Sequence, residues 1–144
     1  LAPGGIVFVQ SPITDPDALW SAVPVAARTE ILERGLRLWA LDTAGLAMQH
    51  SPRPDLAIRM QGVALAGVFL RVAPIATRAG LSRADLMVAV RRQLERFFGK
   101  RGATVVDANL AVIRAAYDGV VDITEAIAGR DRHLPAPVLL EVVR

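Results

Sequence analysis

The chain has 144 residues, of which 53% are hydrophobic and 22% charged, and its formal net charge is +3 at pH 7. This apolar content predicts a folded domain with a core and excludes a disordered segment. The absence of cysteine excludes disulfides, thiolate nucleophiles and cysteine-bound zinc or iron–sulfur clusters within these residues.

The beginning of the chain has the pattern of a strand–helix–strand unit. The run GGIVFVQ at Gly4–Gln10 predicts a strand, and its near-continuous apolar character is typical of an interior strand of a parallel sheet. Asp15, followed by proline, is expected to cap a short helix, and a second helix is expected to stop at Gly35. The run LRLWALD at Leu36–Asp42 predicts the next strand. The fold class is therefore α/β, with a partial Rossmann-like parallel sheet (βαβ) followed by a helical C-terminal half.

The helical half begins with an apolar helix predicted over Leu56–Ala73, in which the run Gly62–Gly67 offers small residues for close packing of another backbone. The longest apolar stretch is interrupted by Arg71 and by a proline, so it is too short to span a membrane. Ser82 resembles the first residue of a capping box and predicts the start of another helix. The expected buried face of that helix comprises Leu86, Val90, Leu94 and Phe97.

A further helix is predicted from about Ala103 to Tyr117, with inward positions at Val105, Ala108 or Leu110, Val112 and Ala116. After it the sequence changes character. We expect residues 1–121 to form one domain and residues 122–144 to be a linker or tail that could lead to another module. Charges and prolines in Gly129–Pro137 indicate the linker, and Val138–Val143 could be a small strand.

Candidate ligand contacts follow the two predicted strands, because open parallel sheets bind ligands beyond the carboxyl ends of their strands. These candidates are Gln10, Ser11, Thr14, Asp42 and Thr43. The alternative is that Thr14 and Asp42 only cap helices, since a cap alone is worth about 1 kcal/mol. No nucleophile elbow, phosphate loop or metal-binding pair is present, and the two histidines are far apart. We therefore expect neither a catalytic residue nor a metal site in this chain.

The densest basic cluster is VRRQLERFFGKRG at Val90–Gly102. It is interpreted as a solvated helix face with cations near the helix C-terminus, with a phosphate-binding surface as the alternative. Its end, FGKRG, does not have phosphate-loop spacing and is interpreted as a helix end, a two-residue connector and a new helix start.

Taken together, these segments resemble the gamma module of the 2-oxoacid:ferredoxin or flavodoxin oxidoreductases, the family of the pyruvate, 2-oxoglutarate and indolepyruvate oxidoreductases. The resemblance covers about Leu1 to Val121. Its most specific positions are Phe98, Gly99, Lys100, Arg101, Gly102, Val105, Val106, Asn109 and Tyr117. Two departures are Ala57, where the family usually has asparagine, and the small residues Val63 and Ala64, where aromatics are common.

The resemblance implies that the chain is the C-terminal part of the gamma domain and that a glycine-rich first half precedes it. The complete enzyme oxidatively decarboxylates a 2-oxoacid to an acyl-CoA, using thiamine diphosphate, Mg²⁺, 4Fe–4S clusters and CoA, none bound by this chain alone. The chain would support assembly and the CoA side of the site without catalysing alone. Its implied partners are other modules of the same cytoplasmic oligomer, with ferredoxin or flavodoxin as electron acceptor, and neither nucleic acid nor membrane. The alternative is a non-catalytic α/β binding or assembly domain.

Overall fold

The structure is a computed structural model that describes residues 2–51 and 53–128. Its contacts divide these residues into two units. The sheet unit comprises residues 2–9, 13–40 and 122–128, and the helical unit comprises residues 10–12 and 41–121, apart from residue 52. The predicted linker at Gly129–Pro137 and the predicted strand at Val138–Val143 lie outside the described residues.

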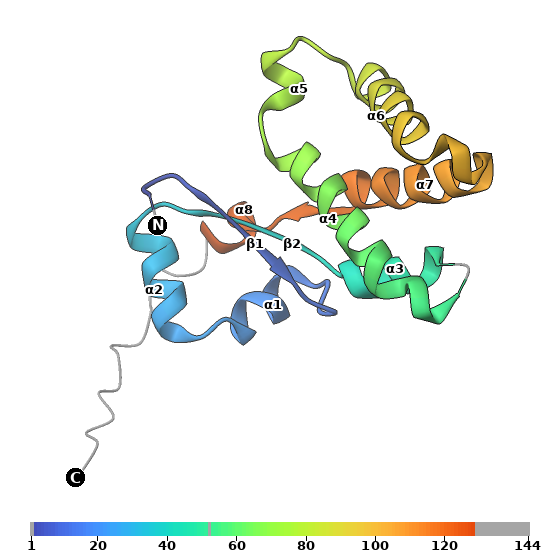
Figure 1. Ribbon diagram of the computed structural model, residues 1–144. Coiled ribbons are helices and arrows are strands. Elements are labelled where there is room, and N and C mark those ends of the chain that lie inside the picture. Colours follow the sequence, from blue (N-terminus) through green and yellow to red (C-terminus); the bar gives the residue numbers. More distant parts are fainter. Residues whose placement is uncertain (1, 52, 129–144) are drawn as a thin grey trace. The chain divides into compact units, whose positions relative to one another are not determined.

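Three strands form one mixed sheet in the order β1-β2-β3, in which β1 and β2 are parallel (Figure 1). The strands are β1 (Ile6–Gln10), β2 (Arg37–Leu41) and β3 (Val121–Asp122). The helices of the sheet unit are α1 (Pro16–Ala22), α2 (Val25–Glu33) and α8 (Thr124–Ala128). The α/β class and the parallel pairing are thus confirmed. Within this sheet β1 is an edge strand with a half-buried centre, so its burial as an interior strand remains a prediction.

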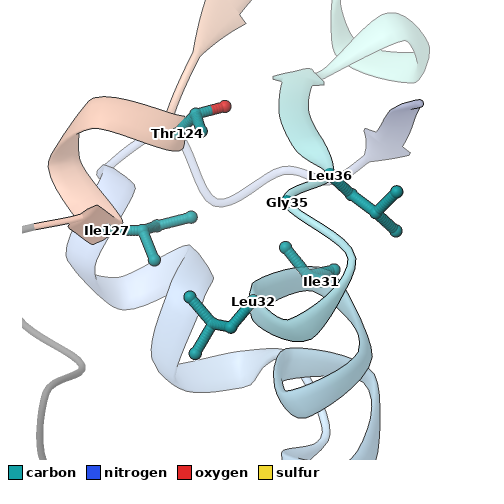
Figure 2. Close-up of a pocket in the computed structure, with 6 residues that line it drawn as sticks. All are labelled: Ile31, Leu32, Gly35, Leu36, Thr124 and Ile127. Carbon is teal, nitrogen blue, oxygen red and sulfur yellow. The ribbon is translucent and has the colours of Figure 1, made fainter. Parts of the chain in front are cut away.

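Local sequence signals place these elements. The Asp15 carboxylate accepts a hydrogen bond from the Ala18 backbone N–H at 2.8 Å, and proline follows it at the first helical position, as predicted for α1. Gly35 adopts a φ of +58°, the left-handed conformation that ends a helix and favours glycine. Figure 2 shows this turn beside a cavity of about 140 Å³. The cavity is mostly apolar, and its lining residues are Ile31, Leu32, Gly35, Leu36, Thr124 and Ile127.

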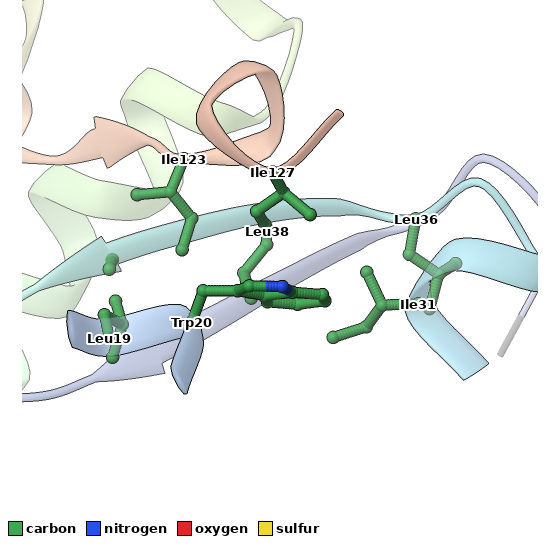
Figure 3. Close-up of a cluster of buried hydrophobic side chains, with 8 residues drawn as sticks. Leu19, Trp20, Ile31, Leu36, Leu38, Ile123 and Ile127 are labelled. Carbon is green, nitrogen blue, oxygen red and sulfur yellow. The ribbon is translucent and has the colours of Figure 1, made fainter. Parts of the chain in front are cut away.

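The core of the sheet unit gathers side chains from both ends of the sequence (Figure 3). Its members are Leu19, Trp20, Ile31, Leu36, Leu38, Ala40, Ile123 and Ile127. Two hydrogen bonds hold the segment that begins at Ile123 against β2. The Ile123 N–H donates to the Leu38 carbonyl and the Leu38 N–H donates to the Thr124 hydroxyl, both at 2.9 Å. The buried segment therefore extends at least to Ile127, past position 121. The division between residues 1–121 and 122–144 remains a prediction.

The helical unit is built from a series of helices joined by short turns. In chain order these are α3 (Thr43–His50), η1 (Pro54–Leu56), α4 (Ala57–Val72), α5 (Ile75–Arg78), α6 (Arg83–Phe98), η2 (Gly99–Arg101) and α7 (Ala103–Gly119). Helix α7 packs against α3, α4 and α6, and Figure 1 shows α6 running alongside α7. The capping box of Ser82 and Asp85 is present at the start of α6, as predicted. None of the helices in residues 2–51 and 53–128 combines the length and apolar character needed to cross a membrane.

The closest approach of α4 and α7 occurs at Gly67. A Cβ atom on Gly67 would lie 2.5 Å from the carbonyl oxygen of Ile113 and 2.8 Å from the Cβ of Ala116. The prediction of close packing in this run is therefore confirmed at Gly67. At Gly62, one end of the same run, a Cβ would meet nothing within 4 Å.

The predicted buried faces are correct in part. On α6, Leu86 is buried and Val90 and Leu94 pack against the core, but Phe97 is 74% exposed, so its predicted burial is wrong. Phe97 lies one residue before the end of α6 and borders an open apolar hollow, which leaves its ring exposed. On α7 the buried positions are Val106, Asn109, Leu110, Val112, Ile113 and Ala116, while Val105 and Ala108 are half-buried.

Ion pairs between α6 and α7 account for part of the basic cluster. Arg91 reaches Asp107 at 2.8 Å and Glu95 at 3.1 Å, and Arg83 pairs with Asp118. The hydrogen bond from Arg83 holds the pKa of the Asp118 carboxyl below its ordinary value. These pairs are about half exposed, so each contributes little to stability. The Arg83–Asp118 and Arg91–Asp107 pairs join α6 to α7, whereas the Arg91–Glu95 pair lies within α6.

Candidate functional site

Polar side chains meet where β1 and β2 end, at the edge that the sequence indicates. The Ser11 N–H donates to the Leu41 carbonyl at 3.3 Å, which holds the segment after β1 against the end of β2. The Thr43 hydroxyl is fully buried and lies 3.5 Å from Gln10 Oε1. Gln61 Nε2, on α4, lies 3.4 Å from the same hydroxyl. These long contacts are weak, and Gln10, Thr43 and Gln61 form what we call the strand-end group.

The other predicted ligand candidates have different surroundings. Asp42 Oδ1 accepts a hydrogen bond from the Gly45 N–H at 2.8 Å and so caps α3. Ser11 is 8% exposed and belongs to the helical unit. Thr14 is exposed and belongs to the sheet unit. The helical unit therefore brings together Gln10, Ser11, Asp42 and Thr43, and ligand binding by any of the candidates remains a prediction.

Gln61 was missed as a member of this group, because contact between α3 and α4 has to be known before it can be placed there. The available signal was its position within the Met-Gln pair of the apolar helix, next to the departures at Ala57 and Val63.

The helical unit also contains a pocket of about 370 Å³ between α4 and α7, which we call the α4–α7 pocket. Its lining residues are Leu56, Arg59, Met60, Val63, Phe98, Arg101, Thr104, Val105, Ala108 and Asn109. Most of this wall is apolar, and its polar groups are two guanidinium groups, the Thr104 hydroxyl and one buried amide. Asn109 is 8% exposed, and its Nδ2 donates to the Val105 carbonyl at 2.7 Å. Such a wall, apolar with a few polar groups, is typical of small-molecule sites.

The connector FGKRG builds one end of this pocket. Helix α6 ends at Phe98, one turn of 3₁₀-helix follows over Gly99–Arg101, and α7 begins after Gly102, whose φ is +103°. Four of the positions that carry the family resemblance line the pocket, namely Phe98, Arg101, Val105 and Asn109. The helix-end interpretation of FGKRG is thus correct, and the lining role adds to it. Sequence reasoning missed the pocket, although the clustering of these positions was a signal for it.

A third hollow, of about 390 Å³, is open and almost entirely apolar, with Phe69 and Phe97 exposed beside it on α4 and α6. It offers no polar group other than the Gln93 amide. Within residues 2–51 and 53–128 there is no group of three or more His, Asp or Glu side chains arranged to hold a metal ion.

Known proteins resemble this chain over most of its length. The family model for pyruvate ferredoxin/flavodoxin oxidoreductase matches residues 1–119. A curated protein of Synechocystis sp., assigned the name pyruvate-flavodoxin oxidoreductase, is 22% identical over 112 residues, which cover 76% of this chain. The chain spans 8% of the length of that relative. Since the family model covers most of the sequence, the chain belongs to the pyruvate ferredoxin/flavodoxin oxidoreductase family.

Proposed function

We propose that the chain is an accessory gamma domain, in its C-terminal part, of a thiamine-diphosphate-dependent 2-oxoacid:ferredoxin or flavodoxin oxidoreductase. The family match over residues 1–119 carries this proposal. The whole enzyme would convert a 2-oxoacid and CoA to an acyl-CoA, and thiamine diphosphate, Mg²⁺ and the clusters would be held by its other modules. This chain would support assembly and form part of the CoA side of the site, without activity alone.

The chemistry of the strand-end group fits a supporting role. Gln10, Thr43 and Gln61 supply neutral amide and hydroxyl groups, which can orient a polar ligand by hydrogen bonds. Asp42 is engaged as a helix cap through Oδ1. Groups of this kind can position a bound molecule, whereas proton transfer at neutral pH needs a group whose pKa is near the working pH. We therefore propose ligand positioning by Gln10, Ser11, Asp42 and Thr43 of the helical unit, and no catalytic step in this chain.

The test measures the CoA-dependent oxidation of pyruvate and other 2-oxoacids by the complete oxidoreductase that contains this chain. The reduction of an electron-accepting dye reports the rate. We expect no activity from the isolated 144-residue chain and a loss of activity when the chain is removed from the complete enzyme. Unchanged CoA-dependent oxidation without the chain would refute the proposal.

A matched pair of variants tests the CoA side separately. Gln10→Ala removes an exposed amide from the strand-end group, and Gln49→Ala removes an exposed amide from the other end of α3. We expect Gln10→Ala to raise the KM for CoA while the KM for the 2-oxoacid stays unchanged, and Gln49→Ala to change neither. Equal kinetics for both variants, combined with dissociation of the other modules when the chain is removed, would favour the alternative of a non-catalytic assembly domain.

A further inference from the structure

Two positive charges, those of Arg59 and Arg101, border the α4–α7 pocket. Arg59 and Arg101 both line it, and neither makes an ion pair with an acid among residues 2–51 and 53–128. Other arginines of the same unit do pair, since Arg53 binds Asp55 and Arg91 binds Asp107. A guanidinium group offers a planar set of donors that matches carboxylate and phosphate. The pocket therefore has the charge of an anion site.

The other lining residues are mostly apolar, so the pocket favours an anion that also has an apolar part. Met60 is buried, and Leu56, Val63, Phe98 and Val105 are half-buried around the cavity. A bare inorganic anion would leave this apolar surface in water, which costs free energy in proportion to its area. The volume of about 370 Å³ lies at the small end of the range of small-molecule sites, about 300–1,000 Å³.

Thr104 adds to the attraction for a negative group. It is the second residue of α7 and lines the pocket, so the positive end of the α7 dipole lies at this wall. Gly102, at the N-cap of α7, has no side chain that could accept the first N–H groups of the helix. A negatively charged group at this wall is therefore attracted both by Arg101 and by the positive end of the α7 dipole beside Thr104.

We propose that the α4–α7 pocket binds a small amphipathic organic anion. Its apolar body lies against Met60, Val63 and Phe98, and its single carboxylate or phosphate group is held by Arg59 and Arg101. The residues of the strand-end group take no part in this site, and the inference does not depend on the proposed function.

The test uses the 144-residue chain and the probes 4-phenylbutyrate and 4-phenylbutyl phosphate, with neutral 4-phenylbutyramide and inorganic phosphate as controls. Calorimetric titration gives the affinities, and amide chemical shifts locate the site. We expect both amphipathic anions to bind at least about fivefold more tightly than the neutral amide, because their charged group gains hydrogen bonds to the arginines. We expect the same minimum difference from inorganic phosphate, because that anion has no apolar body to cover the wall. The shifts should concentrate at residues 56–63 and 98–109, and the stronger of the two anions identifies the preferred charged group. Equal binding of the amide and the anions, or shifts elsewhere, would overturn the proposal.

Charge-removing variants make the test specific. Arg59→Gln and Arg101→Gln should each weaken 4-phenylbutyrate binding about five- to tenfold and leave amide binding unchanged. The matched control is Arg92→Gln, because Arg92 is an exposed arginine of α6 that does not line the pocket. An equal loss in the control would show a general charge effect and refute the site. Ala108→Leu fills the cavity and should weaken both the anion and the amide, and if this variant unfolds, the two arginine variants still decide the question.

Discussion

Gly67 is the position on α4 where an added methyl group should cost most. The backbone carbonyl of Ile113 and the side chain of Ala116, both on α7, would lie 2.5 and 2.8 Å from its Cβ. Carbon atoms pack favourably at about 3.5–4.0 Å, so α4 and α7 must separate to accept the change. Gly62, on the same helix, has open space at the corresponding atom. The two glycines therefore form a matched pair.

The expected magnitude follows from two opposing effects. Replacing glycine by alanine inside a helix gains about 1 kcal/mol of helix propensity at either position. Overpacking at Gly67 costs about 1–3 kcal/mol, because the obstructing atom is a backbone oxygen that cannot rotate away. The propensity gain cancels in the comparison. We therefore expect Gly67→Ala to be about 1–3 kcal/mol less stable than Gly62→Ala.

The assay is urea unfolding followed by far-ultraviolet circular dichroism, which reports mainly the helices of the helical unit. Both tryptophans, Trp20 and Trp39, belong to the sheet unit, so their fluorescence follows that unit separately. We expect Gly62→Ala to match or exceed the wild-type midpoint and Gly67→Ala to fall below it. Equal midpoints for the two variants would refute the close approach of α4 and α7.

Substitutions at three other positions test local interactions. Because Arg83 lowers the pKa of Asp118, the stabilisation by this pair is complete above the ordinary carboxyl pKa of 3.8 and is lost as the pH falls through the lowered pKa. The small difference in unfolding free energy between wild type and Asp118→Asn should therefore be present at neutral pH and disappear when unfolding is measured in acid. Asp42→Ala should cost about 1 kcal/mol by removing the α3 cap, whereas Asp42→Asn should cost only a few tenths because asparagine also caps helices. Since Asp42→Asn keeps the cap and removes the charge, a loss of CoA affinity in this variant would indicate that the carboxylate contacts the ligand. Thr43→Val should destabilise the chain by about 0.5–1 kcal/mol in urea unfolding, because it removes two long contacts to the amides of Gln10 and Gln61; an unchanged midpoint would show that the long contacts contribute nothing.

The elements of the sheet unit from β1 to β2 could be predicted because local chemistry specifies them, whereas β3 and α8 were not predicted. Asp15 before proline begins α1, and Gly35 with positive φ ends α2, and both signals act within a few residues. The short helix α5 was missed, since four residues at Ile75–Arg78 after a proline have no periodicity to detect. The contribution of Ile123 and Ile127 to the core was also missed, because only tertiary contact distinguishes them from the start of a linker.

Positions on helix faces were less predictable than the helices themselves. Spacing alone predicts which face of a helix is apolar but not which part of that face a neighbour covers, and Phe97, expected to be buried, borders an open hollow. On α7 the inward direction was misplaced by about one residue at its first turn, with Val106 buried more deeply than Val105. The candidate site shows the same limit, because the α4–α7 pocket needs residues about 40 positions apart in the sequence to meet.

The connector FGKRG combines backbone and surface roles that two substitutions can separate. Gly102 combines a φ of +103° with a ψ of 156°, a conformation essentially restricted to glycine, so Gly102→Ala should cost about 1–3 kcal/mol of stability. Arg101 makes no ion pair with the acids of the described residues and is exposed, so Arg101→Gln should change the unfolding free energy by less than about 0.5 kcal/mol while weakening anion binding. A large loss of stability in Arg101→Gln would mean that the arginine stabilises the turn. Weaker anion binding by this variant would then no longer be evidence that Arg101 contacts the anion.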